Sequence, residues 1–336
     1  MKCFAILTLL IFILYIIGFS KRTTIAAWMD KNFTTAIKGF SILTIVWAHS
    51  GARLGVGGIQ FIAGIGVSLF LICSGYGLEM SYQKNGLKGF WKKRVWGVCI
   101  PFWIAEWIGL IVTQSFSFRK YVLDTLFLKP ATGYGWFMGY IVVCYFIFFV
   151  IKQFISNKKI SIVTLCGIFL AWFVLESVFF ANPDMPFLKA RQMLAFPCGI
   201  LIAQYKRDIE QILTKTRSIL IFVCGGGIIC ILFMAVTQME AVKQFPYLLS
   251  NILALLTCIP MAIGILVFGK VFCGLIESNM LLAVGSISYE IYLVHAFTLN
   301  IVKDDVSNII LFLSVTVTIA ILLHQLVRMK YKLIKK

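Results

Sequence analysis

A lysine and a histidine of complementary chemistry stand eleven residues apart in the segment TTAIKGFSILTIVWAHSG (34–51), at Lys38 and His49. At 3.6 residues per turn, eleven residues make almost three turns, so both side chains share one helix face, about 16 Å apart along the axis. An ammonium group suits a phosphate-bearing ligand. An imidazole suits general acid–base work because it exchanges protons near neutral pH. This face therefore combines a cation for binding with a group for proton transfer.

Both residues also have a structural interpretation. A lysine near a membrane surface reaches toward the lipid headgroups, and a lone histidine inside a membrane more often serves packing or hydrogen bonding than catalysis. Taken alone, the pair is modest evidence for an enzyme.

The other ionisable residues inside apolar segments are costly there and therefore candidates for function: they are Glu106, Glu176, Glu290 and His295. Glu106 fits either an acid that orients His49 or a structural carboxylate paired with another span. Tyr292 and His295 are three residues apart and share a helix face, whereas Glu290 points elsewhere. Glu176 fits either a contact with a sugar or a charge that faces water. Arg53 fits either an external charge or a ligand for an anionic acceptor.

The elements that carry these residues are membrane spans. Hydrophobic residues make up 60% of the 336-residue chain and charged residues only 13%, against about 25% charged in soluble domains. A span needs roughly 17–25 apolar residues. The sequence predicts an all-α integral membrane bundle of about 10–11 transmembrane helices, at 3–19, 36–50, 59–80, 95–114, 135–151, 160–181, 188–205, 217–237, 248–269, 280–302 and 307–327.

Basic residues divide unequally between the two sides of this bundle. Alternate loops hold 22 of the 31 lysines and arginines, and such loops face the cytoplasm. We therefore expect a multi-pass protein of the bacterial cytoplasmic (inner) membrane, with its N-terminus outside and its C-terminus in the cytoplasm. The same asymmetry accounts for the net charge of +18 without nucleic acid, for which no binding motif is present. The ten cysteines form no CxxC pair, so no metal site is expected.

Several motifs, in order, resemble those of the acyltransferase-3 family of multispan membrane O-acyltransferases. A basic residue, a glycine and a later histidine correspond to Lys38, Gly39 and His49. The segment GVSLFLICSGYGL (66–78) supplies Ser74 and Gly75. Further matches are FWKKRVWGVCIP (90–101) with Arg94 and Pro101, GYGWFMGYIVVCYFIF (133–148) with Trp136, and SISYEIYLVHAF (286–297) with Tyr292 and His295.

The resemblance implies transfer of an acyl group, with acetyl-CoA as the expected donor, from the cytoplasm to a hydroxyl of a cell-envelope glycan or a lipid-linked acceptor. It implies catalysis by His49, as general base or transient acyl carrier, with Glu106 as a second catalytic candidate. The expected donor-binding residues are Lys38, Arg94, Lys93 and Ser74. The expected acceptor-binding residues are Tyr292, His295, Arg53 and Trp136.

The chain departs from the family pattern in several places, among them the stretch before Pro101, where Gly97 and Val98 stand near the position of a second arginine. Lys38 stands where arginine is usual, which keeps the charge but loses the two-pronged guanidinium. The family core has ten spans, so residues 1–33 are interpreted as an extra N-terminal transmembrane helix with a cytoplasmic loop, 34–327 as the acyltransferase domain and 328–336 as a basic cytoplasmic tail. A transporter of a lipid-linked or small anionic envelope precursor is the alternative, although no internal repeat is present. A non-catalytic scaffold is the third.

Overall fold

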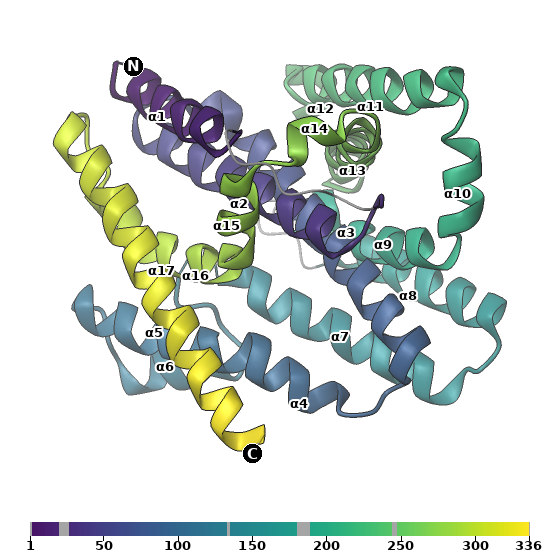
Figure 1. Cartoon of the computed structure of the whole chain (residues 1–336), viewed down its shortest axis with the longest axis horizontal. Coiled ribbons are helices and arrows are strands. Elements are labelled where there is room, and N and C mark those ends of the chain that lie inside the picture. The colour runs from purple at the N-terminus through teal and green to yellow at the C-terminus, as the bar shows by residue number, and fades with distance from the viewer. Residues whose placement is uncertain (1, 20–26, 133–134, 180–188, 244–246, 336) are drawn as a thin grey trace.

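The computed structural model describes residues 2–19, 27–132, 135–179, 189–243 and 247–335, and these residues form an all-α bundle without strands (Figure 1). Seven helices in the described part are long and apolar enough to cross a membrane. The predicted external segment 182–187 and the predicted cytoplasmic Lys21 and Arg22 lie outside the described residues. The protein is therefore a multi-pass all-α membrane protein, as predicted.

Each of the eleven predicted spans corresponds to a helix, although not every one is a full span. The seven are α3 (Gln60–Asn85, extended by the turn η1, Gly57–Ile59), α4–α5 (Phe90–Arg94 and Ile100–Val112), α7 (Trp136–Phe154), α8 (Lys158–Val178), α11 (Thr216–Thr237), α13 (Tyr247–Val271) and α17 (Val306–Lys335). Helix α1 (Lys2–Phe19) is shorter in its apolar part, α2 (Lys31–Arg53) is more polar, and α9 (Ala195–Gln204) has ten residues.

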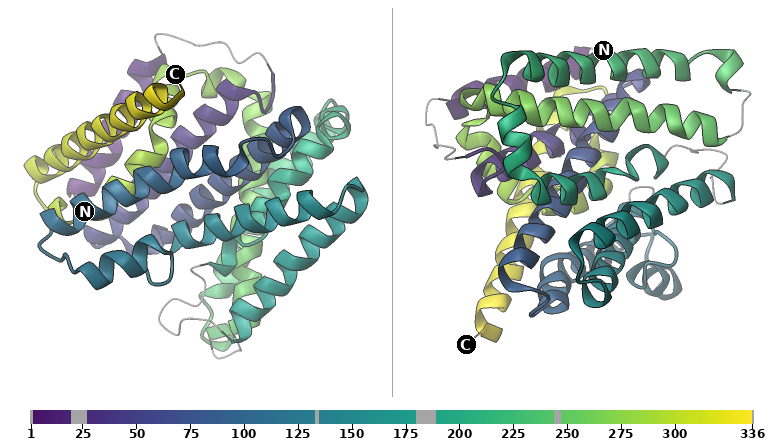
Figure 2. Two further views of the ribbon diagram at one scale, coloured as in Figure 1. Left: turned by 90° about the horizontal axis from the view of Figure 1, so that it is seen from below. Right: turned by 90° about the vertical axis from the view of Figure 1, so that its right-hand side faces the viewer.

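Short helices connect these elements. They are α6 (Phe118–Thr125), η3 (Ala190–Gln192), α10 (Lys206–Ile212), α12 (Glu240–Lys243), α14 (Cys273–Ile276) and η4 (Leu299–Ile301). Figure 2 shows α11 and α13 side by side, and they are among the packed helix pairs. Only 11% of the apolar window of α11 is buried inside the protein. A helix that is apolar all round and this exposed requires a lipid environment.

Helix α2 lies in the middle of the bundle, packed against α3 and α15 (Asn279–Ser286) (Figure 1). Asp30 caps its start, since the carboxylate accepts a hydrogen bond from the backbone N–H of Phe33 at 2.7 Å. The helix then continues without a break to Arg53. Lys38 and His49 therefore stand on one continuous helix, as their spacing predicts.

Glycines of the motifs let the central helices approach closely. A Cβ on Gly39 would lie 2.1 Å from the carbonyl oxygen of Leu281 in α15, and one on Gly285 would lie 1.9 Å from the carbonyl oxygen of Thr35 in α2. A Cβ on Gly75 in α3 would lie 2.2 Å from the carbonyl oxygen of Phe196 in α9. The obstructing atoms are backbone, so no side-chain movement relieves the clash. Small residues at such crossings are typical of membrane helices.

The span that contains Arg94 widens into a π-helical turn, η2 (Val95–Cys99), just before Pro101. Proline cannot donate a backbone hydrogen bond, and its ring clashes with the carbonyl four residues earlier. Single π turns inside α-helices are frequent at functional sites. The hydroxyl of Tyr289 donates to the carbonyl oxygen of Val98 within this turn at 2.7 Å. The basic–proline motif and the C-terminal motif thus meet at η2.

Two predicted spans differ from straight helices. The segment 280–302 is broken into α15 and α16 (Ser288–Thr298), which meet at Ile287 and, with η4 included, are bent by 72°. The segment 188–205 contains the short turn η3 before α9 begins at Ala195. The first break directs α16 toward α2, with which it packs. His295 is thereby brought to the same part of the bundle as His49.

A buried ion pair joins α3 to α7. The ammonium of Lys152 lies 2.9 Å from Glu79 Oε2, with 5% and 3% of the two side chains exposed. Glu79 also accepts a hydrogen bond from Gln204 of α9 at 3.1 Å.

Removing only one partner of this ion pair is expected to destabilise the protein. We expect Lys152→Met to lower the free energy of unfolding by about 3–5 kcal/mol, because the Glu79 carboxylate stays buried without its counter-charge. The double variant Lys152→Met/Glu79→Gln is expected to recover most of that loss. Unfolding titrations in mixed micelles measure both. Equal stability of the single and double variants would contradict this explanation.

Candidate functional site

The imidazoles of His49 and His295 meet in the interior of the bundle. His49 Nδ1 lies 3.1 Å from His295 Nε2, and the two rings are stacked at an interplanar angle of 10°. His49 belongs to α2 and His295 to α16, so the contact joins residues 246 positions apart in the chain. His295 is fully buried and His49 is partly buried. The sequence placed both among the site residues but did not predict that they touch.

The hydrogen bonds assign the protons of this pair. His295 Nδ1 lies 2.5 Å from the carbonyl oxygen of Tyr292, which can only accept, so this nitrogen carries the hydrogen. In a neutral imidazole the other nitrogen is then an acceptor. His295 Nε2 therefore accepts from His49 Nδ1–H, and His49 Nε2 is left with a lone pair. This is the tautomer that a general base or a nucleophile requires.

Aromatic side chains enclose the pair on the side of α7. The ring of Tyr292 lies 5.4 Å from the imidazole of His295 and 5.0 Å from the ring of Phe137. Trp136 contacts Phe137 edge-on at 6.0 Å. Tyr292 and Trp136, both predicted to bind the acceptor, thus stand in the buried wall around His295. Their contact with an acceptor stays a prediction.

Arg191 of η3 is a residue of this region that the sequence analysis missed. Its guanidinium is close enough to the His49 imidazole to act on it electrostatically. A Cβ on Gly64 of α3 would lie 2.9 Å from Arg191 Nε, so glycine leaves the room that the guanidinium occupies. In the sequence Arg191 was counted only as a charge outside the basic loops. Its position inside a predicted span was the signal that could have identified it.

A second polar cluster lies beside η2 and unites three of the motif segments. The hydroxyls of Ser74 and Tyr145 are 3.0 Å apart. The guanidinium of Arg94 stands over the Tyr145 ring at 5.3 Å and over the Phe90 ring at 5.5 Å. Lys38 acts electrostatically on Cys73, the neighbour of Ser74. Ser74 and Arg94, two of the four predicted donor-binding residues, therefore both contact Tyr145. A third, Lys93, is exposed.

Glu106 faces the Asp124 carboxyl. Glu106 comes from α5 and Asp124 from α6, both side chains are buried, and each carboxyl acts electrostatically on the other. The hydrogen-bonded neighbour of His49 is His295 instead. Of the two alternatives for Glu106, the structural carboxylate fits this contact. A catalytic role for Glu106 stays a prediction.

Burial raises the pKa of Asp124 above its ordinary value of 3.8. The folded protein then holds this proton more tightly than the unfolded chain does. The associated stability is complete below the ordinary pKa and is lost as the pH rises through the raised one. We expect the unfolding midpoint of the wild type to fall relative to that of Asp124→Asn as the pH increases from about 4. Replacement of the exposed Asp208 by asparagine is the control. Parallel pH curves for the wild type and Asp124→Asn would contradict this.

The remaining predicted residues have partners that lie apart from the histidine pair. Arg53 donates to Asn300 Oδ1 at 3.1 Å. Glu176 forms an ion pair with Lys189 at 2.9 Å. Glu290 lies 2.7 Å from Nδ1 of His324, a residue of α17. Glu290 and His295 thus point to different neighbours, as their spacing predicts.

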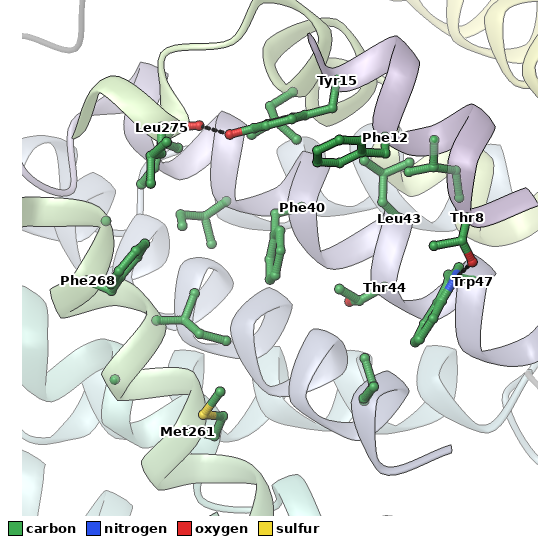
Figure 3. Close-up of a pocket in the computed structure, with 18 of the residues that line it drawn as sticks. Thr8, Phe12, Tyr15, Phe40, Leu43, Thr44, Trp47, Met261, Phe268 and Leu275 are labelled. Atoms are coloured by element: carbon green, nitrogen blue, oxygen red, sulfur yellow. Dashed lines mark hydrogen bonds between the residues drawn. The ribbon is translucent and has the colours of Figure 1, made fainter. Parts of the chain in front are cut away.

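A large apolar cavity of about 650 Å³ lies on the other face of α2 (Figure 3). It is lined by residues of α1, α2 and α13, with Tyr15 closing one end through a hydrogen bond to the Leu275 carbonyl. Phe40 and Trp47 reach into it from α2. These two positions are roughly 180–200° around the helix from Lys38. The helix itself therefore separates this cavity from the stripe that carries Lys38 and His49.

The described residues hold no cluster of three or more histidine, cysteine or acidic side chains able to bind a metal. Residues 26–325 match the model of a protein family described as an acyltransferase domain. Comparison with curated proteins and with solved structures finds no match. The matched region begins after α1 and includes both polar clusters.

Proposed function

Because the chain belongs to the acyltransferase-3 family, and is thus a membrane acyltransferase, we propose that it moves an acyl group from cytoplasmic acyl-CoA to a hydroxyl of a cell-envelope glycan or a related lipid-linked acceptor. Acetyl-CoA is the proposed donor. The observation that carries the proposal is the hydrogen-bonded series from the Tyr292 carbonyl through His295 to His49. It assigns the hydrogen of the His49 imidazole to Nδ1 and the lone pair to Nε2, which is the tautomer of a general base or a nucleophile.

The reaction needs one base and one electrophile. His49 Nε2 removes the proton of the acceptor hydroxyl as its oxygen attacks the thioester carbonyl. The C–O bond forms, the C–S bond breaks, and the thiolate of coenzyme A leaves and takes the proton from His49. In the covalent variant, Nε2 itself attacks the thioester and the acceptor oxygen then displaces the imidazole. Both routes give an ester and free coenzyme A.

The donor side of the proposal is supported by the cluster beside η2. A coenzyme carries phosphates, and cations at the cytoplasmic edge of the bundle attract them. Lys38 and Arg94 supply such cations, and Arg94 Nε is buried with no hydrogen-bond partner in the described part of the chain. The Ser74 hydroxyl next to this guanidinium provides a further polar contact. The narrow pantetheine arm would then extend along α2 toward His49.

The proposed orientation follows from the asymmetry of the basic loops. Donor binding in the bacterial cytoplasm and an acceptor on the outer side of the cytoplasmic membrane make the reaction a transfer across the bilayer. A transporter needs no imidazole pair with this arrangement of protons, so no observation in the structure favours that alternative.

Radiolabelled acetyl-CoA tests the proposal directly. Sealed vesicles of known orientation that contain the protein are supplied with label on one face. We expect hydroxylamine-sensitive label in the envelope glycan fraction only when the donor meets the face that carries the basic loops. Absence of ester transfer from acetyl-CoA and from longer acyl-CoAs, to glycan and lipid-linked fractions alike, would refute it.

His295 is expected to act as a positioning residue, because its Nε2 accepts from His49 Nδ1–H and so orients the His49 imidazole. We expect His295→Ala to lower kcat by about 100-fold with little change in KM for acyl-CoA. His295→Gln should recover part of this loss, since its amide oxygen can accept from His49 Nδ1–H. The pH profile of kcat should also change in His295→Ala, where His49 exchanges tautomers. Equal activity of the alanine and glutamine variants, with an unchanged pH profile, would contradict the positioning role.

A further inference from the structure

A second cavity, of about 360 Å³, lies beside Arg191 and the short turn η1 that follows α2. Its size falls in the range of about 300–1,000 Å³ that is usual for small-molecule sites. Its walls come from η1, the start of α3, η3, the end of α11 and the first half of α13: they include Gly58, Gln60, Arg191, Thr237, Gln238 and Thr257.

The rim of this cavity faces the side opposite to the basic loops. Gly57 and Gly58 follow the end of α2, and Thr237 and Gln238 stand at the end of α11. Both helices begin next to lysines and arginines that the proposed orientation places in the cytoplasm. The cavity therefore opens where an external acceptor would arrive, and a donor from the cytoplasm would approach His49 from the opposite end of α2.

Arg191 makes this cavity chemically specific. Its side chain lines the cavity, and its Nε is buried without a hydrogen-bond partner among the described residues. No carboxylate in the described part forms an ion pair with it. A guanidinium offers planar, paired donors that match a carboxylate or a phosphate. A buried donor that lacks a partner costs free energy, and an oxyanionic ligand would remove that cost.

The wall of the cavity is also hydrogen-bonded to α2, the helix that carries His49. The side-chain amide of Gln60 donates to the carbonyl oxygen of Ala48 at 2.6 Å. Ala48 is the residue that precedes His49. A ligand held by Arg191 would thus lie next to the segment of α2 that presents the imidazole. Hydroxyl and amide groups from Thr237, Gln238 and Thr257 provide further polar contacts for a hydroxylated molecule.

We propose that this cavity is the acceptor subsite and that Arg191 selects acceptors bearing an oxyanion, a carboxylate or a phosphate, close to the hydroxyl that is acylated. This inference rests on the proposed function and narrows its acceptor to anionic sugars. Binding of the oxyanion by Arg191 fixes one end of the sugar, so that a neighbouring hydroxyl is directed toward His49.

Three sugars of similar size test the subsite by binding alone: methyl glucuronide, glucose 1-phosphate and methyl glucoside, at matched ionic strength. The purified full chain in detergent is titrated with each, and the thermal unfolding midpoint is recorded. We expect saturable stabilisation by one or both anionic sugars and none by methyl glucoside. The stronger of the two anionic ligands identifies the carboxylate or the phosphate as the natural group. Equal responses to all three sugars would overturn the proposal.

Two variants separate Arg191 from general electrostatics. Arg191→Gln is expected to weaken binding of the anionic sugar at least about 10-fold, the loss of one charge-assisted hydrogen bond. Lys189→Gln removes the same charge two residues away, from a surface ion pair with Glu176, and should bind like the wild type. Equal losses in both variants would overturn the role of Arg191.

Acyl transfer measured in parallel distinguishes this inference from the proposed function. Anion binding lost in Arg191→Gln, with no acyl transfer by the wild type, would refute the acyltransferase proposal and leave an oxyanion site. Transfer by the wild type to charged and neutral sugars at equal rates would refute the subsite alone.

Discussion

His49→Ala is expected to lower the rate of acyl transfer by about 1,000-fold or more, while the fold and the binding of coenzyme A are kept. General acid–base catalysis by a positioned side chain contributes about 100- to 10,000-fold, and loss of a nucleophile costs at least as much. His49 is placed for either role because its Nδ1–H is held by His295. No other imidazole in the described part of the chain lies beside this pair, since His324 bonds to Glu290.

Two further variants make this experiment specific. His49→Gln keeps a polar side chain beside His295 but has no basic nitrogen, so its activity should be as low as that of the alanine variant. Ser50→Ala alters the adjacent, fully buried residue, whose hydroxyl has no hydrogen-bond partner among the described residues, and should transfer acyl groups like the wild type. Coenzyme A binding is measured by calorimetry. Transfer by His49→Ala within 10-fold of the wild-type rate would exclude His49 as base and as acyl carrier.

Gly75→Ala is expected to lower both the stability of the protein and its affinity for acyl-CoA. The new Cβ would lie 2.2 Å from the carbonyl oxygen of Phe196, so α3 and α9 must separate. Overpacking of this kind typically costs about 1–3 kcal/mol. The movement would also displace Ser74, which contacts Tyr145 beside Arg94. We therefore expect lower acyl-CoA affinity together with a lower unfolding midpoint.

Gly77→Ala is the matched control on the same helix. A Cβ at Gly77 meets nothing within 4 Å, and alanine is favoured over glycine inside a helix by about 1 kcal/mol. The unfolding midpoint of this variant should equal or exceed that of the wild type. Similar losses in Gly75→Ala and Gly77→Ala would show that the close approach of α3 to α9 does not determine the stability.

Local patterns sufficed for some of these features. The eleven-residue spacing placed Lys38 and His49 on one face of a helix, and α2 is a continuous helix over both. Apolar segments of sufficient length predicted an all-α membrane bundle. Lipid cannot satisfy backbone hydrogen bonds, so each such segment has to form a helix. These inferences need no knowledge of which helices are neighbours.

Contacts between distant segments could not be read from the same patterns. The partner of His49 is 246 residues away, and its position depends on the bend at Ile287 between α15 and α16. Glu106 faces Asp124, which lies between two of the predicted spans, 95–114 and 135–151. Lys152 forms a buried ion pair with Glu79 of α3, a contact between distant segments that no local pattern predicts. For each of these residues the helix period predicts on which face of the helix the side chain lies. Which residue the side chain contacts depends on how the helices pack.

Helix α2 separates two regions of different polarity. One face of the helix carries Lys38 and His49, and the opposite face borders the apolar cavity drawn in Figure 3. The proposed reaction uses no residue of this cavity. Leu43 borders this cavity, so a larger apolar residue there adds contacts where atoms are missing. Such substitutions are expected to stabilise the protein without changing its activity, because they lie on the face of α2 opposite to the His49 imidazole.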